Sequence, residues 1–315
     1  MLHNLKDIVE EFSFWAIEPI ADAQFSHHQI SSLFNKLSAQ MRGAELEGIP
    51  KEEILDIVAP VRYIFKESPF FCRIQTWPRG YVGDFETVEY VFSQNNKAIP
   101  NSFAWFLEQK ALGSLAGQQH RNKVRWQANL AAEILCDRNS LRLLSIACGG
   151  SIDLRLLKRE LSSADITIVL NDLDRDALNF SVEQLHHIEK NIHIIHGDAF
   201  RSTKNFSKKA PYDLILIGGL MDYLSPKQIK WLLKKLVPLL APNGIIGLTN
   251  IGLHNPDRVW MEYIADWQLI ERSKAELHLL IEEAIDCEDS AIEMCLDKSG
   301  LTHLVRIHTS KSRPF

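Results

Sequence analysis

The stretch Leu143–Leu157, LLSIACGGSIDLRLL, joins a strand pattern to the start of a helix. Its first half is a short apolar run, as in a strand that is buried on both faces. Gly149, Gly150 and Ser151 then form a turn of very small residues, which lets a ligand approach the backbone closely. No lysine follows that could bind phosphates, and the glycines do not follow the spacing G-x-G-x-x-G. The turn therefore predicts a ligand with little phosphate to bind.

Strand-like apolar runs alternate with helical stretches from about residue 141 onward. The expected strands cover 142–148, 166–172, 192–198, 212–219 and 244–250, and the expected helices lie near 152–162, 175–190 and 226–240. Such alternation predicts an α/β fold in which helices cover both faces of a mostly parallel, Rossmann-like sheet. Two further strand patterns, joined by a tight turn at Ser299 and Gly300, predict a C-terminal antiparallel hairpin.

Residues 1–137 lack strand alternation and are expected to be mostly helical. Within them, Pro78, Gly80 and Gly83 indicate a loop, and Asp84 stands where the N-cap of the next helix belongs. We expect a helical N-terminal domain or lid at 1–137 and a ligand-binding domain at 138–315.

Composition narrows the function classes. The chain has 315 residues and a formal net charge of −5, which argues against a general nucleic-acid partner. The 5 cysteines form no C-x-x-C pair, so we expect neither disulfides nor a zinc site, and a reducing cytoplasm fits. No signal-peptide pattern and no apolar run long enough to span a membrane is found. The adjacent histidines do not share a helix face and are interpreted as surface residues, so no metal is expected.

Small and acidic residues follow the first four strands of the predicted sheet. Ligands of open α/β sheets bind beyond the carboxyl ends of the strands. The residues there are Ala147, Cys148, Gly149 and Ser151 after the first strand, Asp172 and Leu173 after the second, Asp198, Ala199 and Phe200 after the third, and Gly218, Gly219, Asp222 and Tyr223 after the fourth. We expect these strand ends to form one site.

The acids among them suit a nucleoside. Asp172, about 20 residues past a glycine turn, can accept hydrogen bonds from both ribose hydroxyls. Asp198 can accept from an exocyclic amine, and the N–H of Ala199 can donate to a ring nitrogen. Asp198 also suits a surface turn without any contact with adenine, and this alternative stays open. An adenosine site without phosphate recognition fits S-adenosylmethionine best.

Residues 141–309 resemble the class I S-adenosylmethionine-dependent methyltransferases, through the succession of strand-end motifs and the closing hairpin. The segments 78–90, PRGYVGDFETVEY, and 255–272, NPDRVWMEYIADWQLIER, extend the likeness. They resemble a bacterial group with a helical N-terminal extension, which includes enzymes that make 3-hydroxypalmitic acid methyl ester. The resemblance implies S-adenosylmethionine as cofactor and a loop at 79–84 that folds over it.

The first motif departs from the family pattern. The family usually shows D/E-x-G-x-G-x-G, whereas this chain has Ser145, Ala147, Gly149 and Ser151 at the corresponding positions. The acid that usually holds the amino group of the methionine is missing. Asp84 is the expected substitute, and Tyr81 of the same loop is expected to contact the cofactor.

Methyl transfer from a sulfonium is a direct displacement, so the protein chiefly aligns the reactants. A carboxylate acceptor is already ionised at neutral pH and needs no base. A hydroxyl acceptor would need one, and His254 or Asp222 are the candidates. Tyr223, Trp260 and Tyr263 are the expected acceptor-binding residues, although Trp260 also suits a core position.

We therefore expect a methyltransferase of a small molecule, acting on the carboxylate of an acid such as a hydroxy fatty acid. Two alternatives stay open. The acceptor can instead be a hydroxyl, amine or carbon of a secondary metabolite, or the protein can bind S-adenosylmethionine without catalysis, as the altered first motif allows. The amphipathic helices of the extension also allow a homodimer.

Overall fold

The computed structural model describes residues 2–17, 23–138, 140–285 and 290–309, so Cys287 lies outside the described residues. The chain divides into two compact units. Unit 1 comprises Met1–Gln118 and Asn255–Gln268, and unit 2 comprises Gln119–His254 and Leu269–Phe315. The boundary expected from the sequence, between residues 137 and 138, stays a prediction, and the compact units divide the chain at different positions.

Unit 1 is helical. Its elements are α1 (Leu2–Ile17), α2 (Ala23–Leu46), α3 (Lys51–Phe65), α4 (Pro69–Thr76), α5 (Phe85–Ser93), α6 (Phe103–Leu112) and α13 (Arg258–Tyr263). Aromatic side chains build much of its core. The ring of Phe65 lies 4.5 Å from that of Phe71 and 5.4 Å from that of Phe12, between ring centroids. Such edge-to-face and offset pairs stabilise a core beyond their area burial.

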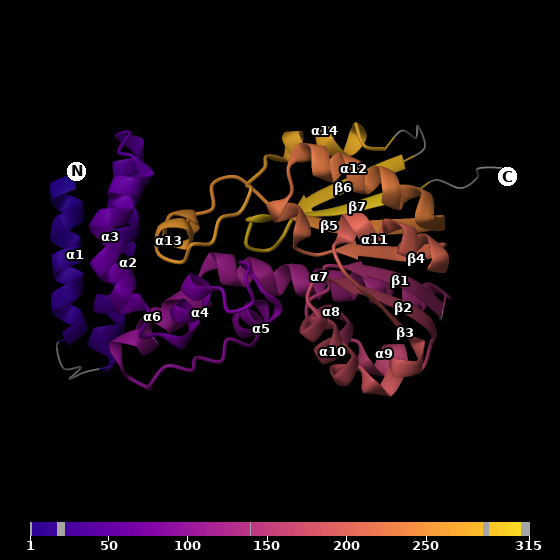
Figure 1. Cartoon of the computed structure of the whole chain (residues 1–315), viewed down its shortest axis with the longest axis horizontal. Helices are drawn as coiled ribbons and strands as arrows, with labels where there is room; N and C mark the ends of the chain where they lie inside the picture. The colour runs from indigo at the N-terminus through magenta and orange to yellow at the C-terminus, as the bar shows by residue number, and fades with distance from the viewer. Residues whose placement is uncertain (1, 18–22, 139, 286–289, 310–315) are drawn as a thin grey trace. The chain divides into compact units, whose positions relative to one another are not determined.

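Unit 2 contains a seven-stranded sheet in the order β3-β2-β1-β4-β5-β7-β6 (Figure 1). The strands are β1 (Ser140–Ile146), β2 (Asp165–Asp172), β3 (Ile192–His196), β4 (Tyr212–Ile217), β5 (Leu240–Ile251), β6 (Ser290–Leu296) and β7 (Thr302–Thr309). The strands β1 to β5 run parallel, whereas β7 pairs antiparallel with both β5 and β6. The expected mostly parallel sheet with a C-terminal antiparallel hairpin is confirmed.

Helices cover both faces of this sheet, as Figure 1 shows. One face packs against α11 (Ala199–Phe206), α12 (Pro226–Leu236) and α14 (Lys274–Glu282). The other face packs against α7 (Leu115–Arg138), α8 (Ile152–Arg155), α9 (Lys158–Ser162) and α10 (Arg175–Gln184). Short 3-10 segments, η1 (His186–Asn191), η2 (Ser207–Lys209), η3 (Leu220–Tyr223) and η4 (Val237–Leu239), join these elements. Because both faces are covered, the central strands β1, β2 and β4 are buried along most of their length.

Most of α7 belongs to unit 2 because its apolar side packs on the sheet. Leu130 and Leu135 are buried in the same cluster as Leu143 of β1. A Cβ at Gly247 of β5 would lie 2.6 Å from a methyl carbon of Leu130, so the glycine lets the helix approach the strand. No helix among the described residues is long and apolar enough to cross a membrane.

Candidate functional site

The turn after β1 has a left-handed backbone at alternate positions. Ala147, Gly149 and Ser151 have φ values of 51°, 53° and 51°. Glycine adopts such a conformation without steric cost, whereas alanine and serine do not. These are the positions where the first-motif pattern of the family has glycines. The turn geometry therefore persists here although two of the three residues carry a Cβ.

Side chains from neighbouring elements hold the turn in place. The hydroxyl of Ser181, on α10, donates to the carbonyl of Gly149 at 2.8 Å and receives a hydrogen bond from the hydroxyl of Ser151 at 3.1 Å. Ser151 is fully buried. A guanidinium nitrogen of Arg155 donates to the carbonyl of Gly150 at 3.3 Å. This network fixes the path of the backbone at the end of β1.

Asp172 ends β2 and faces this turn. Its Oδ2 accepts from the N–H of Gly149 at 2.8 Å, and its Oδ1 accepts from the N–H of Asp174 at 2.9 Å. Burial raises the pKa of the carboxyl. An ionised carboxylate has about four lone-pair positions, so two backbone bonds leave room for hydroxyl donors.

Residues at the end of β3 are held close to β2. The side-chain amide of Asn171 donates to the carbonyls of Ile195 and Gly197 at 2.8 and 2.9 Å, and its own oxygen is buried without a hydrogen-bond partner among the described residues. Asp198 is the N-cap of α11, since its Oδ1 accepts from the N–H groups of Phe200 and Arg201. The described bonds thus give Asp198 a structural role, and its contact with adenine stays a prediction.

The other predicted residues at these strand ends differ in exposure. Ala199 is buried, Phe200 packs against the core, and Leu173 is 62% exposed. Burial, with the nearby charge of Asp172, raises the pKa of the Cys148 thiol. This thiol therefore stays protonated and is a poor nucleophile.

Gly218 and Gly219 follow β4, and Asp222 comes next in η3. The Oδ1 of Asp222 accepts from the N–H of Ile251 at 2.7 Å, and its Oδ2 lies 3.6 Å from the Nζ of Lys123. Burial raises the pKa of this carboxyl. Tyr223, by contrast, is 38% exposed.

Sequence reasoning missed three polar residues beside these strand ends. Lys123 and Gln127 lie on α7, and the Nε2 of Gln127 donates at 3.3 Å to the Oδ2 of Asp153 on α8. Burial raises the pKa of Asp153 to about 6. In the sequence, Lys123 and Gln127 have a spacing of one helical turn, which suits a solvent-exposed polar face as well as a stripe beside a binding site. Only the burial of these residues in the structure distinguishes the two interpretations.

Comparison with known proteins agrees with this geometry. Residues 144–246 match the model of a protein family described as a methyltransferase domain. Unit 2 contains a class I methyltransferase domain. S-adenosylmethionine is the methyl donor of such domains, so the protein is an S-adenosylmethionine-dependent methyltransferase.

Solved structures share the fold of this methyltransferase. A possible exported protein from Bordetella parapertussis is 15% identical, with 94% of this chain and 100% of that chain covered and a TM-score of 0.62. The apo form of the S-adenosylmethionine-dependent methyltransferase SibL is 16% identical, with 86% and 77% covered and a TM-score of 0.50. Identities this low show the fold alone. Among curated proteins, none matches the sequence.

The strand ends of the methyltransferase domain fit the cofactor chemically. The turn after β1 is tight and formed by small residues, and Asp172 is a buried carboxylate with acceptor positions to spare. At the end of β4, a Cβ on Gly218 would meet the side chain of Gln127 at 2.5 Å. These features fit a nucleoside without 5′ phosphates, as in S-adenosylmethionine. No group of three or more His, Cys, Asp or Glu residues in the described chain could hold a metal.

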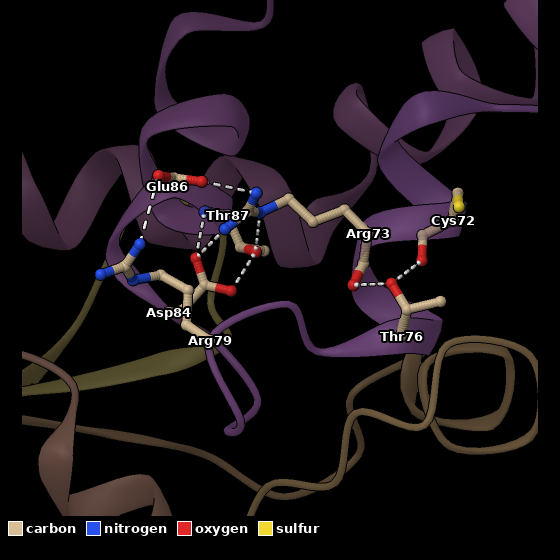
Figure 2. A network of polar contacts seen from close by, with 7 residues as sticks. All are labelled: Cys72, Arg73, Thr76, Arg79, Asp84, Glu86 and Thr87. Carbon is tan, nitrogen blue, oxygen red and sulfur yellow. Dashed lines mark hydrogen bonds and ion pairs between the residues drawn. The ribbon is translucent and has the colours of Figure 1, made fainter. Parts of the chain in front are cut away.

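The loop expected to cover the cofactor lies in unit 1 (Figure 2). The predicted N-cap is confirmed, because the Oδ1 of Asp84 accepts from the N–H of Thr87 at 3.0 Å at the start of α5. Arg73 donates to Asp84 at 2.5 Å and to the hydroxyl of Thr87 at 2.9 Å. Arg73 and Arg79 also pair with Glu86, at 2.6 and 3.5 Å. The contacts of Tyr81 and Asp84 with the cofactor stay predictions.

The remaining predicted residues occupy two different settings. Trp260 lies in the core of unit 1, where its ring centroid is 5.7 Å from that of Phe34. Tyr263 is also buried there, and burial and a hydrogen bond to Glu45 raise the pKa of its hydroxyl. His254 is exposed in unit 2, with a left-handed φ of 67°. Their roles in acceptor binding and catalysis stay predictions.

Proposed function

We propose that this methyltransferase transfers the methyl group to a carboxylate of a small apolar acid, such as a hydroxy fatty acid. The observation that carries the proposal is the state of Asp222. Both of its oxygens are engaged, one by the N–H of Ile251 and the other by the ammonium of Lys123. Protonation of Asp222 would leave the largely buried ammonium of Lys123 without its ionised partner, and this cost makes Asp222 a poor general base.

An acceptor that is already ionised removes the need for a base. A carboxylic acid with an ordinary pKa is deprotonated at neutral pH and attacks the methyl group directly. The protein then has to align the carboxylate oxygen, the methyl carbon and the sulfur. The resemblance of the segments 78–90 and 255–272 to enzymes that make 3-hydroxypalmitic acid methyl ester supports a fatty acid as the acceptor.

The test is an acceptor screen with radiolabelled S-adenosylmethionine. We expect label transfer to 3-hydroxypalmitate, with a base-labile ester as product, and no transfer to the matching alcohol. A His254→Ala variant should keep the wild-type rate. Transfer to hydroxyl or amine acceptors with loss of activity in His254→Ala would favour the alternative class of acceptors. Tight cofactor binding without transfer to any acceptor would favour a non-catalytic binding protein.

A further inference from the structure

A stripe of polar side chains on α7 lies beside the strand ends of the methyltransferase domain. The stripe consists of Gln119, Lys123 and Gln127, which follow one another at four-residue intervals. The Oε1 of Gln119 accepts from the hydroxyl of Thr302 at 2.7 Å. Lys123 pairs with Asp222, and Gln127 bonds Asp153. Residues four apart share a helix face, so the stripe is one continuous surface of α7 that contacts other elements of unit 2.

Lys123 is a largely desolvated cation with donor capacity to spare. Its side chain is 11% exposed, and its Nζ would lie 3.5 Å from a Cβ on Gly219. An ammonium group has three N–H donors. The 3.6 Å separation from Asp222 is an ion pair rather than a good hydrogen bond. The ammonium can therefore donate to an anion at the end of β4.

Gln127 has an amide whose orientation is determined by its neighbour. An ionised Asp153 can only accept hydrogen bonds, so the Nε2 of Gln127 faces it and the Oε1 is directed elsewhere. The absence of a Cβ at Gly218 lets the amide lie against the backbone there, since a Cβ would come within 2.5 Å of both amide heteroatoms. The Oε1 of Gln127 is thus the acceptor of this amide, and it lies beside the backbone of Gly218.

We propose that Lys123 and Gln127 bind the amino-acid end of S-adenosylmethionine, with Lys123 donating to its carboxylate and the Oε1 of Gln127 accepting from its ammonium group. Asp222 and Asp153 are the positioning residues behind them. A zwitterion needs a cation and an acceptor side by side, and one helical turn separates these two residues. The proposal rests on the cofactor and is independent of the identity of the acceptor.

The arrangement accounts for the altered first motif. Ser145 stands where the family usually has an acid, and both oxygens of Asp84, the substitute expected from the sequence, are bonded to Arg73 or Thr87. A donor and an acceptor on α7 supply the same recognition from a different element. The turn after β1 then needs no charged side chain, because its small residues only have to allow the cofactor to approach the backbone.

Calorimetric titration with two probes tests the proposal. S-adenosylhomocysteine carries the amino-acid end, and 5′-methylthioadenosine shares the adenosine and thioether but lacks that end. For Lys123→Met we expect the Kd for S-adenosylhomocysteine to rise at least about tenfold, as expected for the loss of a charge-assisted hydrogen bond. The Kd for 5′-methylthioadenosine should stay within about twofold, since the rest of the site is intact. Gln127→Leu should show the same selective loss, and Lys123→Arg should retain part of the affinity.

Binding of 5′-methylthioadenosine also reports folding of each variant. Lys208→Met is the matched control, because Lys208 is an exposed lysine of unit 2 whose ammonium bonds Asn205. An unchanged Kd for S-adenosylhomocysteine in Lys123→Met would overturn the proposal, and so would an equal loss of both probes in Lys123→Met and Lys123→Arg. Failure of the acceptor screen would leave this result untouched, so the two proposals fail separately.

Discussion

The carboxylate of Asp172 accepts a hydrogen bond from the backbone N–H of Gly149, with 2.8 Å between Oδ2 and N. One residue ends β2 and the other lies in the turn after β1, and these strands pair in parallel. The bond ties the ends of these two strands to each other. Asp172 therefore has a structural role, and its predicted role in binding the cofactor would fall at the same position.

Replacement of Asp172 by alanine should remove both roles. We expect the Kd for S-adenosylhomocysteine to rise by more than about tenfold and the free energy of unfolding to fall by about 1–3 kcal/mol, because the N–H groups of Gly149 and Asp174 lose a charged acceptor. Titration calorimetry and urea unfolding measure the two effects. The control is Asp165→Asn at the exposed start of β2, which should change neither quantity. Undiminished binding in Asp172→Ala would remove Asp172 from the site.

Ala147→Gly should stabilise the protein. Ala147 has a φ of 51°, which costs alanine more than glycine, so we expect a gain of about 0.5–1 kcal/mol. Thermal unfolding measures it. Ala132→Gly, inside α7, is the matched control and should lose about 0.5–1 kcal/mol, because glycine weakens a helix interior. A loss of stability in both variants would contradict the strained turn described here.

The pH dependence of stability should change in Asp153→Asn. The folded protein binds the proton of the Asp153 carboxyl group more tightly than the unfolded chain does, because burial raises the pKa of this group from 3.8 to about 6. The contribution of Asp153 to stability therefore falls as the pH rises from about 4 to 6, and it stays low above. This amounts to up to about 3 kcal/mol at 1.36 kcal/mol per pKa unit.

The asparagine variant lacks this titration. We expect the stability of the variant, measured as its free energy of unfolding minus that of the wild type, to be higher at pH 8 than at pH 4.5. Denaturant unfolding at both pH values measures the difference. Equal differences at the two pH values would show that Asp153 is not buried with a raised pKa.

Asp84→Ala should destabilise unit 1. The variant loses the N-cap of α5 and leaves Arg73 without its buried partner, and we expect a loss of about 2–4 kcal/mol. Glu86→Ala is the matched control in the same network, and its loss should stay below about 0.5–1 kcal/mol because the Glu86 side chain is 46% exposed. Thermal unfolding measures both. Comparable losses in the two variants would indicate that the network in Figure 2 is solvated.

The sequence by itself determined the α/β fold of unit 2 and the residues at its strand ends. Apolar runs of strand length and helices with polar faces have different periods, and the alternation of the two implies a parallel sheet. A parallel sheet then brings its carboxyl ends to one edge, so Gly149, Asp172 and Gly218 could be grouped from their positions alone.

Only the tertiary structure decided which polar residues of α7 and α8 belong beside that edge. Lys123, Gln127 and Asp153 lie in segments whose polar residues would suit solvent equally well. Their burial depends on how α7 packs on β5 and on the absence of a Cβ at Gly218, both of which involve residues far apart in the chain. Likewise, the left-handed backbone of Ala147 and Ser151 could not be predicted from the sequence, because neither residue favours that conformation by itself. Hydrogen bonds to Asp172 and Ser181, which lie on other elements, hold Gly149 and Ser151 in this turn.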